Sequence, residues 1–407
     1  MITIRPFKAL RPRPEWALRV AAPPYDVMSR EEAKNAAGDN PHSFLHVTRS
    51  EIDLPEVANP YDPKVYEKAK QNLQRMIADG TLIKEAQACL YIYELTMNER
   101  SMTGLACLSS IEDYQNGLIN KHELTRPEKE NDRILHITIT RAQTGKVFLA
   151  YKSVQEVDAV IHDWKTRHEP LYHFTAADNV THAVWKIDDE RTIQHIITLF
   201  KEKVPATYIA DGHHRAASAT QVSNVLPDNE SARFFLTVIF PDNHLHIMDY
   251  NRAVTDLNGL TPTELLTRIR EDFEVSESTE AVSPTRPHEI GMYLQKRWYR
   301  LSARPGTYAE DLIGQLDVSI LSANILDKHL GLKDIRTDKR IDFIGGIRGL
   351  KELERLVNDS KMQVSFSLYP VTIQQLFNIA DAGLIMPPKS TWFEPKLRDG
   401  LLTHLLE

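Results

Sequence analysis

The amino-acid sequence predicts a mixed α/β fold. Segments rich in β-branched and aromatic residues alternate along the chain with segments whose apolar residues recur at helical spacing. The composition, 42% hydrophobic and 26% charged, is that of a folded protein with a sizeable core. A length of 407 residues is long for one domain. We therefore expect an N-terminal α/β region over 1–172, a middle region over 173–257 and a C-terminal α/β region over 258–407.

Helices and strands are expected to alternate in the N-terminal region. The helices follow from apolar periodicity, a serine N-cap or a closing glycine, and the strands follow from β-branched and aromatic runs. The expected helices cover 30–37, 65–80 and 156–167. The expected strands cover 89–97, 102–114 and 147–152, and the first two are predicted to pair around Asn98–Arg100.

The same signals extend through the rest of the chain. In the middle region we expect strands at 181–188 and 206–211, helices at 189–203 and 214–224, and a hairpin over 233–254 that turns at Pro241–Asn243. In the C-terminal region we expect helices at 261–273, 317–329 and 347–359, and strands within 289–303, 341–346 and 362–370.

Charge and cysteine content exclude several classes of protein. A net charge of -7 and the lack of a helix-turn-helix pattern argue against nucleic acid as a partner. Cys89 and Cys107 carry no CxxC spacing, so we expect reduced cysteines packed in strands. No signal peptide and no membrane-spanning run is visible, which predicts a cytoplasmic protein without a membrane partner.

One short joint between a predicted strand and a predicted helix carries most of the functional signal. The apolar strand ends at Asp211, and Gly212, His213, His214 and Arg215 open the helix. The first N–H groups of a helix lack intrahelical partners and lie at the positive end of its dipole. Glycine allows an anion to approach the backbone closely, and a guanidinium can hold a phosphate through two hydrogen bonds. The joint therefore predicts a phosphate-binding loop. The alternative is that Asp211 only caps the helix and that the two histidines are ordinary surface residues.

A metal site is the alternative for the same residues. Asp211, His213 and His214 are possible ligands, and His244 and His246 alternate farther along the chain. No HExxH, CxxC or HxHxD pattern accompanies them. We expect no metal held by the protein alone, and Mg²⁺ arriving with a nucleotide fits better.

Five segments, taken in order, resemble the family of unknown function DUF1015. They are APPYDV (22–27), NPHSFLHV (40–47), HELTRPEKENDR (122–133), ADGHHR (210–215) and MPPKSTWFEPKLRDGL (386–401). The resemblance covers nearly the whole chain, but the family name implies no activity.

The strand, the DGHHR joint and the following helix also resemble the phosphate-binding core of the ParB/sulfiredoxin superfamily, most closely its free serine kinases. This resemblance implies a ParB/sulfiredoxin-like core with large N- and C-terminal α/β additions. It further implies that Gly212, His213 and Arg215 contact phosphate, and that Asp211 shapes the loop or binds a substrate amine or hydroxyl. The kinases use a carboxylate near their N-terminus as base, which has no aligned counterpart here.

Other polar residues are candidates for the same site. Asp26 follows two prolines and is either an Asx-turn residue or a general base on a rigid loop. His122, Glu123 and Arg133 fall in a charged segment without strand character, which we interpret as a loop. That loop is either a solvated face or a source of an acid–base carboxylate, Glu123, and of two phosphate contacts, His122 and Arg133.

A lysine-containing segment near the C-terminus is a further candidate. KSTW resembles the end of a Walker A loop only superficially, because the preceding glycine pattern is missing. Packing by Trp392 and Phe393 would explain the segment, but Lys389 and Ser390, with Thr391 and Lys396, have the chemistry to reach a phosphate.

Three functions follow from these residues. The first is a kinase that transfers phosphate from ATP or ADP with Mg²⁺ to a small hydroxylated metabolite, for which free serine is one candidate. Asp211, Asp26 or Glu123 would act as base, and His213 and His214 are further catalytic candidates. The alternatives are a phosphatase of a small phosphorylated metabolite, and a ParB-like nucleotide-binding switch without catalysis. The substrate and the oligomeric state stay open.

Overall fold

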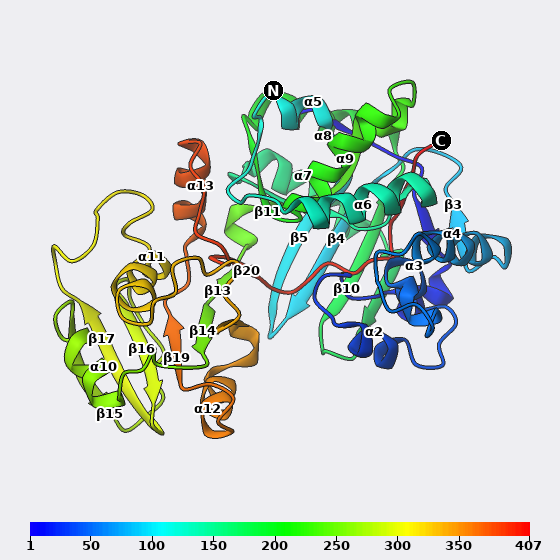
Figure 1. The fold of residues 1–407 in the computed structure, drawn as a ribbon. Helices are drawn as coiled ribbons and strands as arrows, with labels where there is room; N and C mark the ends of the chain where they lie inside the picture. The colour runs from blue at the N-terminus through cyan, green and yellow to red at the C-terminus, as the bar shows by residue number, and fades with distance from the viewer. The chain divides into compact units, whose positions relative to one another are not determined.

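The computed structural model describes all 407 residues, which form two compact units (Figure 1). The first unit consists of Met1–Leu245 and Pro395–Glu407, and the second of His246–Glu394. Each is built around its own sheet with helices, so the predicted mixed α/β class is confirmed. The boundaries of these units differ from those of the three predicted regions, because strands from 1–172 and from 173–257 share one sheet.

A nine-stranded mixed sheet forms the centre of the first unit. β11 runs antiparallel to β8, and β8 runs parallel to its other neighbour, β12. In the order in which they pair, the strands are β6 (Ile119–Asn120), β11 (Thr207–Asp211), β8 (Val147–Tyr151), β12 (Phe234–Pro241), β5 (Arg100–Ser110), β4 (Leu90–Met97), β10 (Thr181–Ile187) and β9 (Tyr172–Thr175), while β1 (Ile4–Arg5) pairs with β5.

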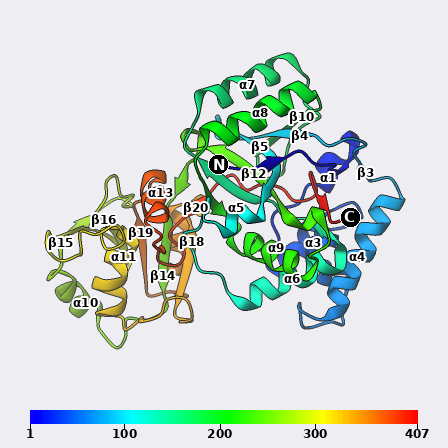
Figure 2. The same ribbon diagram turned by 90° about the horizontal axis from the view of Figure 1, so that it is seen from above.

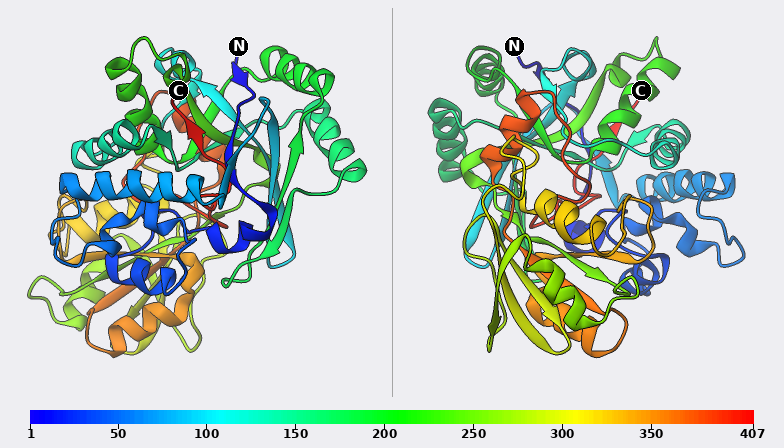
Figure 3. Two further views of the ribbon diagram at one scale, coloured as in Figure 1. Left: turned by 90° about the vertical axis from the view of Figure 1, so that its right-hand side faces the viewer. Right: turned by 60° about the vertical axis from the view of Figure 1, so that its left-hand side comes forward.

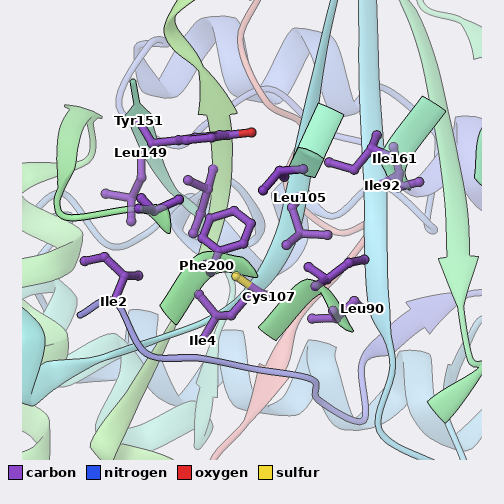
Figure 4. Close-up of a cluster of buried hydrophobic side chains, with 14 of the residues drawn as sticks. Ile2, Ile4, Leu90, Ile92, Leu105, Cys107, Leu149, Tyr151, Ile161 and Phe200 are labelled. Carbon is purple, nitrogen blue, oxygen red and sulfur yellow. The ribbon is translucent and has the colours of Figure 1, made fainter. Parts of the chain in front are cut away.

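Helices pack along both sides of this sheet (Figure 2). α7 (Gln155–Arg167) and α8 (Glu190–Lys203) lie together on one side, and α6 (Pro127–Thr140) and α9 (His213–Val225) lie together on the other. Figure 4 shows part of the hydrophobic core, in which Phe200 of α8 meets Leu105 and Cys107 of β5. Cys89, directly before β4, is also buried, so both cysteines lie in the packed interior, as predicted.

The N-terminal part of the first unit is a helical layer with its own apolar cluster. Its helices are α1 (Ala17–Val20), α2 (Arg30–Ala37), α3 (Leu45–Thr48) and α4 (Pro63–Ala78), and a short α5 (Ile111–Gln115) follows β5. Two small strand pairs complete the unit, β2 (Leu10–Pro12) with β3 (Leu82–Lys84), and β7 (Ala142–Gln143) with β21 (His404–Leu405).

The C-terminal segment Pro395–Glu407 is part of the first unit, although the second unit precedes it in the chain. The N–H of Asp399 donates to the carbonyl of Ala22 at 2.8 Å, and the N–H of Thr403 donates to the carbonyl of Leu10 at 2.9 Å. Figure 3 shows this segment, in red, running among the elements of the first unit.

The second unit is organised around a six-stranded antiparallel sheet. Its order is β15 (Phe273–Ser278), β17 (Arg297–Ala303), β16 (Glu289–Leu294), β19 (Val364–Leu368), β14 (Tyr250–Val254) and β18 (Ile341–Gly345), and a separate pair joins β13 (Ile247–Met248) to β20 (Trp392–Phe393). Its helices are α10 (Pro262–Ile269), α11 (Asp317–Leu321) continued by a π-helix (Ser322–Asp327), α12 (Leu350–Asn358) and α13 (Ile373–Asp381).

Two predictions of local structure are wrong, and the strand expected over 102–114 ends at Ser110, where α5 begins. The expected hairpin over 233–254 does not form, because β12 pairs with β5 and β8 whereas β14 pairs with β18 and β19. The expected loop that includes Arg133 is largely α6, which begins with Pro127 at its first turn and acidic residues that suit a helix N-terminus. No helix in the structure is long and apolar enough to cross a bilayer.

The burial of the C-terminal segment yields a prediction about stability. Leu402 is 0% exposed, so Leu402→Ala should lower the free energy of unfolding by about 2–5 kcal/mol through lost burial and a residual cavity. Leu18, 53% exposed, is the control, and Leu18→Ala should change it by less than about 0.5 kcal/mol. Urea unfolding measures both, and equal effects would show that the segment is not part of the core.

Candidate functional site

A left-handed glycine joins β11 to α9. Gly212 has a φ of 97° and stands at the N-cap of the helix. A Cβ at this position would lie 3.1 Å from the guanidinium carbon of Arg215 and 3.3 Å from the Cα of Val147. The joint therefore requires glycine both for its backbone conformation and for the close approach of a guanidinium.

The N-terminus of α9 presents backbone donors at this joint. The first N–H bonded within the helix is that of Ala216, which donates to the carbonyl of Gly212 at 3.0 Å. The N–H groups of His213, His214 and Arg215 precede it and lie at the positive end of the helix dipole. The predicted strand, glycine and helix are therefore confirmed at this joint.

Asp211 is held between two cations. Its carboxylate lies 3.1 Å from Nζ of Lys396 and 3.4 Å from a terminal nitrogen of Arg215. Burial acts to raise the pKa of Asp211, but Lys396 and then Arg215 outweigh burial and bring the pKa well below its ordinary value. A carboxylate stabilised in this way is a poor proton acceptor.

Arg215 is a buried guanidinium with most of its donors engaged. One terminal nitrogen donates to the carbonyl of Lys146, the other faces Asp211, and Nε is buried with no partner. Burial acts to lower the pKa of Arg215, while Asp211 and then Asp26 raise it above its ordinary value. Arg215 is thus always charged and held in place, with Nε as its unpaired donor.

Two buried imidazoles face each other beside the joint. The rings of His122 and His213 meet edge to face, with centroids 4.5 Å apart. The backbone N–H of His122 donates to Nε2 of His213 at 3.4 Å, and Nδ1 of His213 lies 3.9 Å from the carboxylate of Glu123. Neither ring nitrogen of His122 has a partner.

Burial keeps both of these histidines neutral near pH 7. It lowers the pKa of His122 to about 4. Burial, followed by the neighbouring His122, also lowers the pKa of His213 well below its ordinary value. Neutral imidazoles at the positive end of a helix are suited to hydrogen bonding with an anion rather than to acid catalysis at neutral pH.

A second group of buried charges lies behind Arg215, and sequence reasoning missed it. Nζ of Lys146 donates to the carbonyl of Arg398 at 2.7 Å, and burial lowers the pKa of this lysine to about 8. Oδ2 of Asp399 has no partner, and burial raises the pKa of Asp399 to about 6. The only available signal was that Arg398 and Asp399 fall in one of the segments that resemble the family.

A small pocket lies next to Arg215 in the first unit. Tyr25, Arg133, Thr144 and Gly145 are among the residues that line it. The guanidinium of Arg133 lies 3.9 Å from the centre of the Tyr25 ring and pairs with Asp132 at 2.8 Å. Arg133 therefore reaches the surroundings of Arg215 from α6, rather than from the loop that was predicted to carry it.

The predicted site residues divide between the two units. Most of them lie in the first unit, at the joint or beside its pocket. These are Asp26, His122, Glu123, Arg133 and Asp211 to Arg215. Lys389 and Ser390 belong to the second unit, where the Ser390 hydroxyl donates to the carbonyl of Pro387 at 2.6 Å and Lys389 is exposed. A phosphate-binding role for these two residues stays a prediction.

The donors at the joint fit a phosphate group. Nε of Arg215 and the ring nitrogens of His122 are buried without partners, and the first N–H groups of α9 face the same joint. Across the structure, no group of three or more His, Cys, Asp or Glu side chains is arranged to hold a metal ion.

Comparisons with known proteins place one family model on this chain. The model described as "Protein of unknown function (DUF1015)" matches residues 4–319. No curated protein matches. A solved structure of a free serine kinase in complex with AMP aligns at a TM-score of 0.37 and 14% identity over 73% of this chain and 91% of the kinase.

Two further solved structures align to a similar extent. A conserved hypothetical protein from Pyrococcus furiosus has a TM-score of 0.36 and 12% identity over 74% of this chain and 94% of its own. SbnI from Staphylococcus aureus, truncated at its C-terminus, has a TM-score of 0.36 and 10% identity over 72% of this chain and 85% of its own. Similarities this low do not transfer an activity to this chain.

The geometry of the joint predicts the effect of adding one methyl group. Gly212→Ala should lower the free energy of unfolding by about 1–3 kcal/mol, since it combines a positive φ with contacts to Arg215 and Val147. Gly117→Ala is the matched control, because φ is 73° there but nothing lies within 4 Å of the added Cβ. Urea unfolding should show the larger loss at Gly212, and equal losses would mean that the crowding has no energetic effect.

The buried carboxyl of Asp399 predicts a pH dependence. The fold raises the pKa of Asp399 from 3.8 to about 6, so the folded state binds this proton more tightly than the unfolded state. This contribution to stability is complete below about pH 4 and should be lost, by about 3 kcal/mol, as the pH rises to about 6. In urea unfolding, the change in the free energy of unfolding from pH 4 to pH 6 should be more positive, by about 3 kcal/mol, for Asp399→Asn than for the exposed control Asp39→Asn. Parallel curves would contradict the prediction.

Proposed function

This chain belongs to the DUF1015 family, and we propose that its first unit is a nucleotide-dependent phosphotransferase acting on the hydroxyl group of a small metabolite. The observation that carries the proposal is the joint at Gly212, where helix N–H groups, a buried cation and a buried unpartnered imidazole converge. Phosphoryl transfer demands such positioning and charge stabilisation more than covalent chemistry from the protein.

The phosphate would be bound by groups that need little rearrangement. The N–H groups at the start of α9 and Nε of Arg215 supply donors, and a ring nitrogen of neutral His122 supplies one more. Lys396 and Arg215 together exceed the negative charge of Asp211. Arg215 and Lys396 would attract an anion to the joint and stabilise the charge that develops on the transferred group.

Glu123 is the carboxylate best suited to accept the hydroxyl proton. Its carboxylate lies 3.9 Å from His213 and its side chain is 38% exposed, so a substrate can reach it beside the helix N-terminus. Asp211 is less suited because its pKa is lowered by Lys396 and Arg215 against the effect of burial. Asp26, which is exposed and lies within the field of Arg215, is the competing candidate.

The chemical step is a direct transfer. The hydroxyl oxygen of the substrate forms a bond to the terminal phosphorus of the nucleotide, and the bond from that phosphorus to its bridging oxygen breaks. The hydroxyl proton passes to a carboxylate oxygen of Glu123, and the electron pair of the broken bond stays on the nucleotide, where the positive charge at the joint stabilises it.

The nucleotide would be ATP or ADP, and Mg²⁺ would enter with it. Bound Mg²⁺ supplies neutralisation of phosphate charge and holds the phosphate chain in one conformation. Of the carboxylates near the joint, the exposed Asp26 would contact that ion or one of its waters, since Asp211 is paired with Lys396 and Arg215 and Glu123 would act as base. A small acceptor such as free serine is the first to test, because the joint resembles that of free serine kinases.

A nucleotide-binding switch is the second candidate. It is favoured by the fact that both terminal nitrogens of Arg215 are already engaged, by Lys146 and Asp211, so that this guanidinium has less to offer a transition state. A phosphatase that uses a histidine to protonate its leaving group has less support, because burial leaves His122 and His213 without that proton at neutral pH.

Glu123→Gln tests the proposal. Loss of the base should lower kcat by about 10²- to 10⁴-fold, while the nucleotide Kd should change by less than about threefold. Isothermal titration measures the Kd, and transfer of labelled phosphate to serine and related hydroxy compounds measures turnover. Glu128→Gln, an exposed substitution in the first turn of α6, is the control and should leave both values unchanged.

Two outcomes would change the conclusion. A loss of turnover in Asp26→Asn with little loss in Glu123→Gln would move the base to Asp26 and leave the reaction intact. Tight nucleotide binding by the unmodified protein, with neither transfer nor hydrolysis across the panel, would exclude the phosphotransferase and leave the switch.

A further inference from the structure

The segment from His122 to Arg126 is tied to the first turn of α9 at both of its ends. The backbone N–H of His122 donates to Nε2 of His213 at 3.4 Å. The backbone N–H of Arg126 donates to Nε2 of His214 at 3.0 Å. Because a backbone N–H can only donate, both ring nitrogens must act as acceptors and therefore carry no proton.

The same segment is also tied to α6. The Thr125 hydroxyl donates to the carboxylate of Glu130, and the N–H of Glu130 donates to the carbonyl of Arg126 at 3.0 Å. Ser218 of α9 connects the two helices by donating its hydroxyl to the carbonyls of His214, at 2.7 Å, and Glu130, at 3.1 Å. The segment is thus held by α9 on one side and by the beginning of α6 on the other.

Glu123 lies between the two histidine contacts. Only three residues separate His122 from Arg126, so fixing both ends leaves the intervening backbone little freedom. The carboxylate of Glu123 lies 3.9 Å from Nδ1 of His213 in this arrangement. A shift of about 1 Å in a base relative to its substrate can cost about 10²-fold in rate.

We propose that His214 is a positioning residue, which holds the 122–126 segment through the N–H of Arg126 and thereby places the carboxylate of Glu123 at the start of α9. The proposal assigns His214 a different role from the catalytic one predicted from sequence. Its Nε2 is occupied as an acceptor and cannot donate a proton from that atom while the contact persists. The role of Glu123 as base rests on the proposed function, whereas the tie itself does not.

The experiment compares two substitutions at one position. His214→Phe removes the acceptor but keeps a planar ring, and His214→Gln keeps an acceptor oxygen on a flexible side chain. His195, exposed on α8, provides the matched controls His195→Phe and His195→Gln. Thermal unfolding by circular dichroism identifies any variant that fails to fold.

Amide hydrogen exchange of peptides covering 121–127, followed by mass spectrometry without any ligand, measures the tie directly. His214→Phe should speed exchange in these peptides by about tenfold or more, and His214→Gln should restore most of the protection. The His195 variants should exchange like the unmodified protein. Unchanged exchange in a folded His214→Phe, or no recovery in His214→Gln, would overturn the proposal.

Kinetics then connect the tie to Glu123. His214→Phe should lower kcat by about tenfold or more with little change in the nucleotide Kd, and His214→Gln should recover activity in parallel with protection. A loss that appears in Kd instead would make His214 a ligand-binding residue and overturn the positioning role. If no variant and no unmodified protein transfers phosphate, the proposed function fails while the exchange result still decides the tie.

Discussion

The buried guanidinium of Arg215 is the constraint on which the rest of the site depends. A buried charge must be paired and hydrogen-bonded, and here the partners are the carbonyl of Lys146 and the carboxylate of Asp211. Space for it exists only because Gly212 and Gly145 lack side chains, since a Cβ on either would lie within 3.2 Å of Arg215. The end of β11, the beginning of β8 and the first turn of α9 are thus fixed by one side chain.

The polar groups around this guanidinium differ in charge state for one physical reason. Burial disfavours the charged form of each group, and the groups have unequal numbers of charged partners to offset that effect. Asp211 stays ionised because Lys396 and Arg215 oppose the effect of burial on its pKa. Burial prevails at His122, which is neutral near pH 7, and it raises the pKa of Asp399 to about 6. A rigid cation, an ionised acid and neutral imidazoles thus lie side by side before any ligand binds, as the anion site that we propose would require.

How much of this could be predicted from the sequence depended on how local each signal was. The joint was predictable because a strand, a glycine and a helix follow one another within a few residues. The helix that carries Arg133 was missed because charged residues hide the apolar spacing of its buried face, which includes His136 and Ile137. The partners of β12 and β14 were not predictable, because a local turn signal says nothing about which distant strands will pair. Lys146 and Asp399 were missed since the burial of an isolated charge is a property of the folded chain.

The position of Pro395–Glu407 bears on how the protein is made. During synthesis the ribosome releases residues up to Leu245 first, then the whole second unit, and only then the thirteen residues that complete the first unit. Lys396, which pairs with Asp211, and Asp399, which lies behind Arg215, belong to this last piece. A nascent or prematurely terminated chain therefore lacks two of the charges around the joint. The charges around the joint can be brought together only after the second unit has been synthesised, so the assembly of the joint depends on the segment that follows that unit.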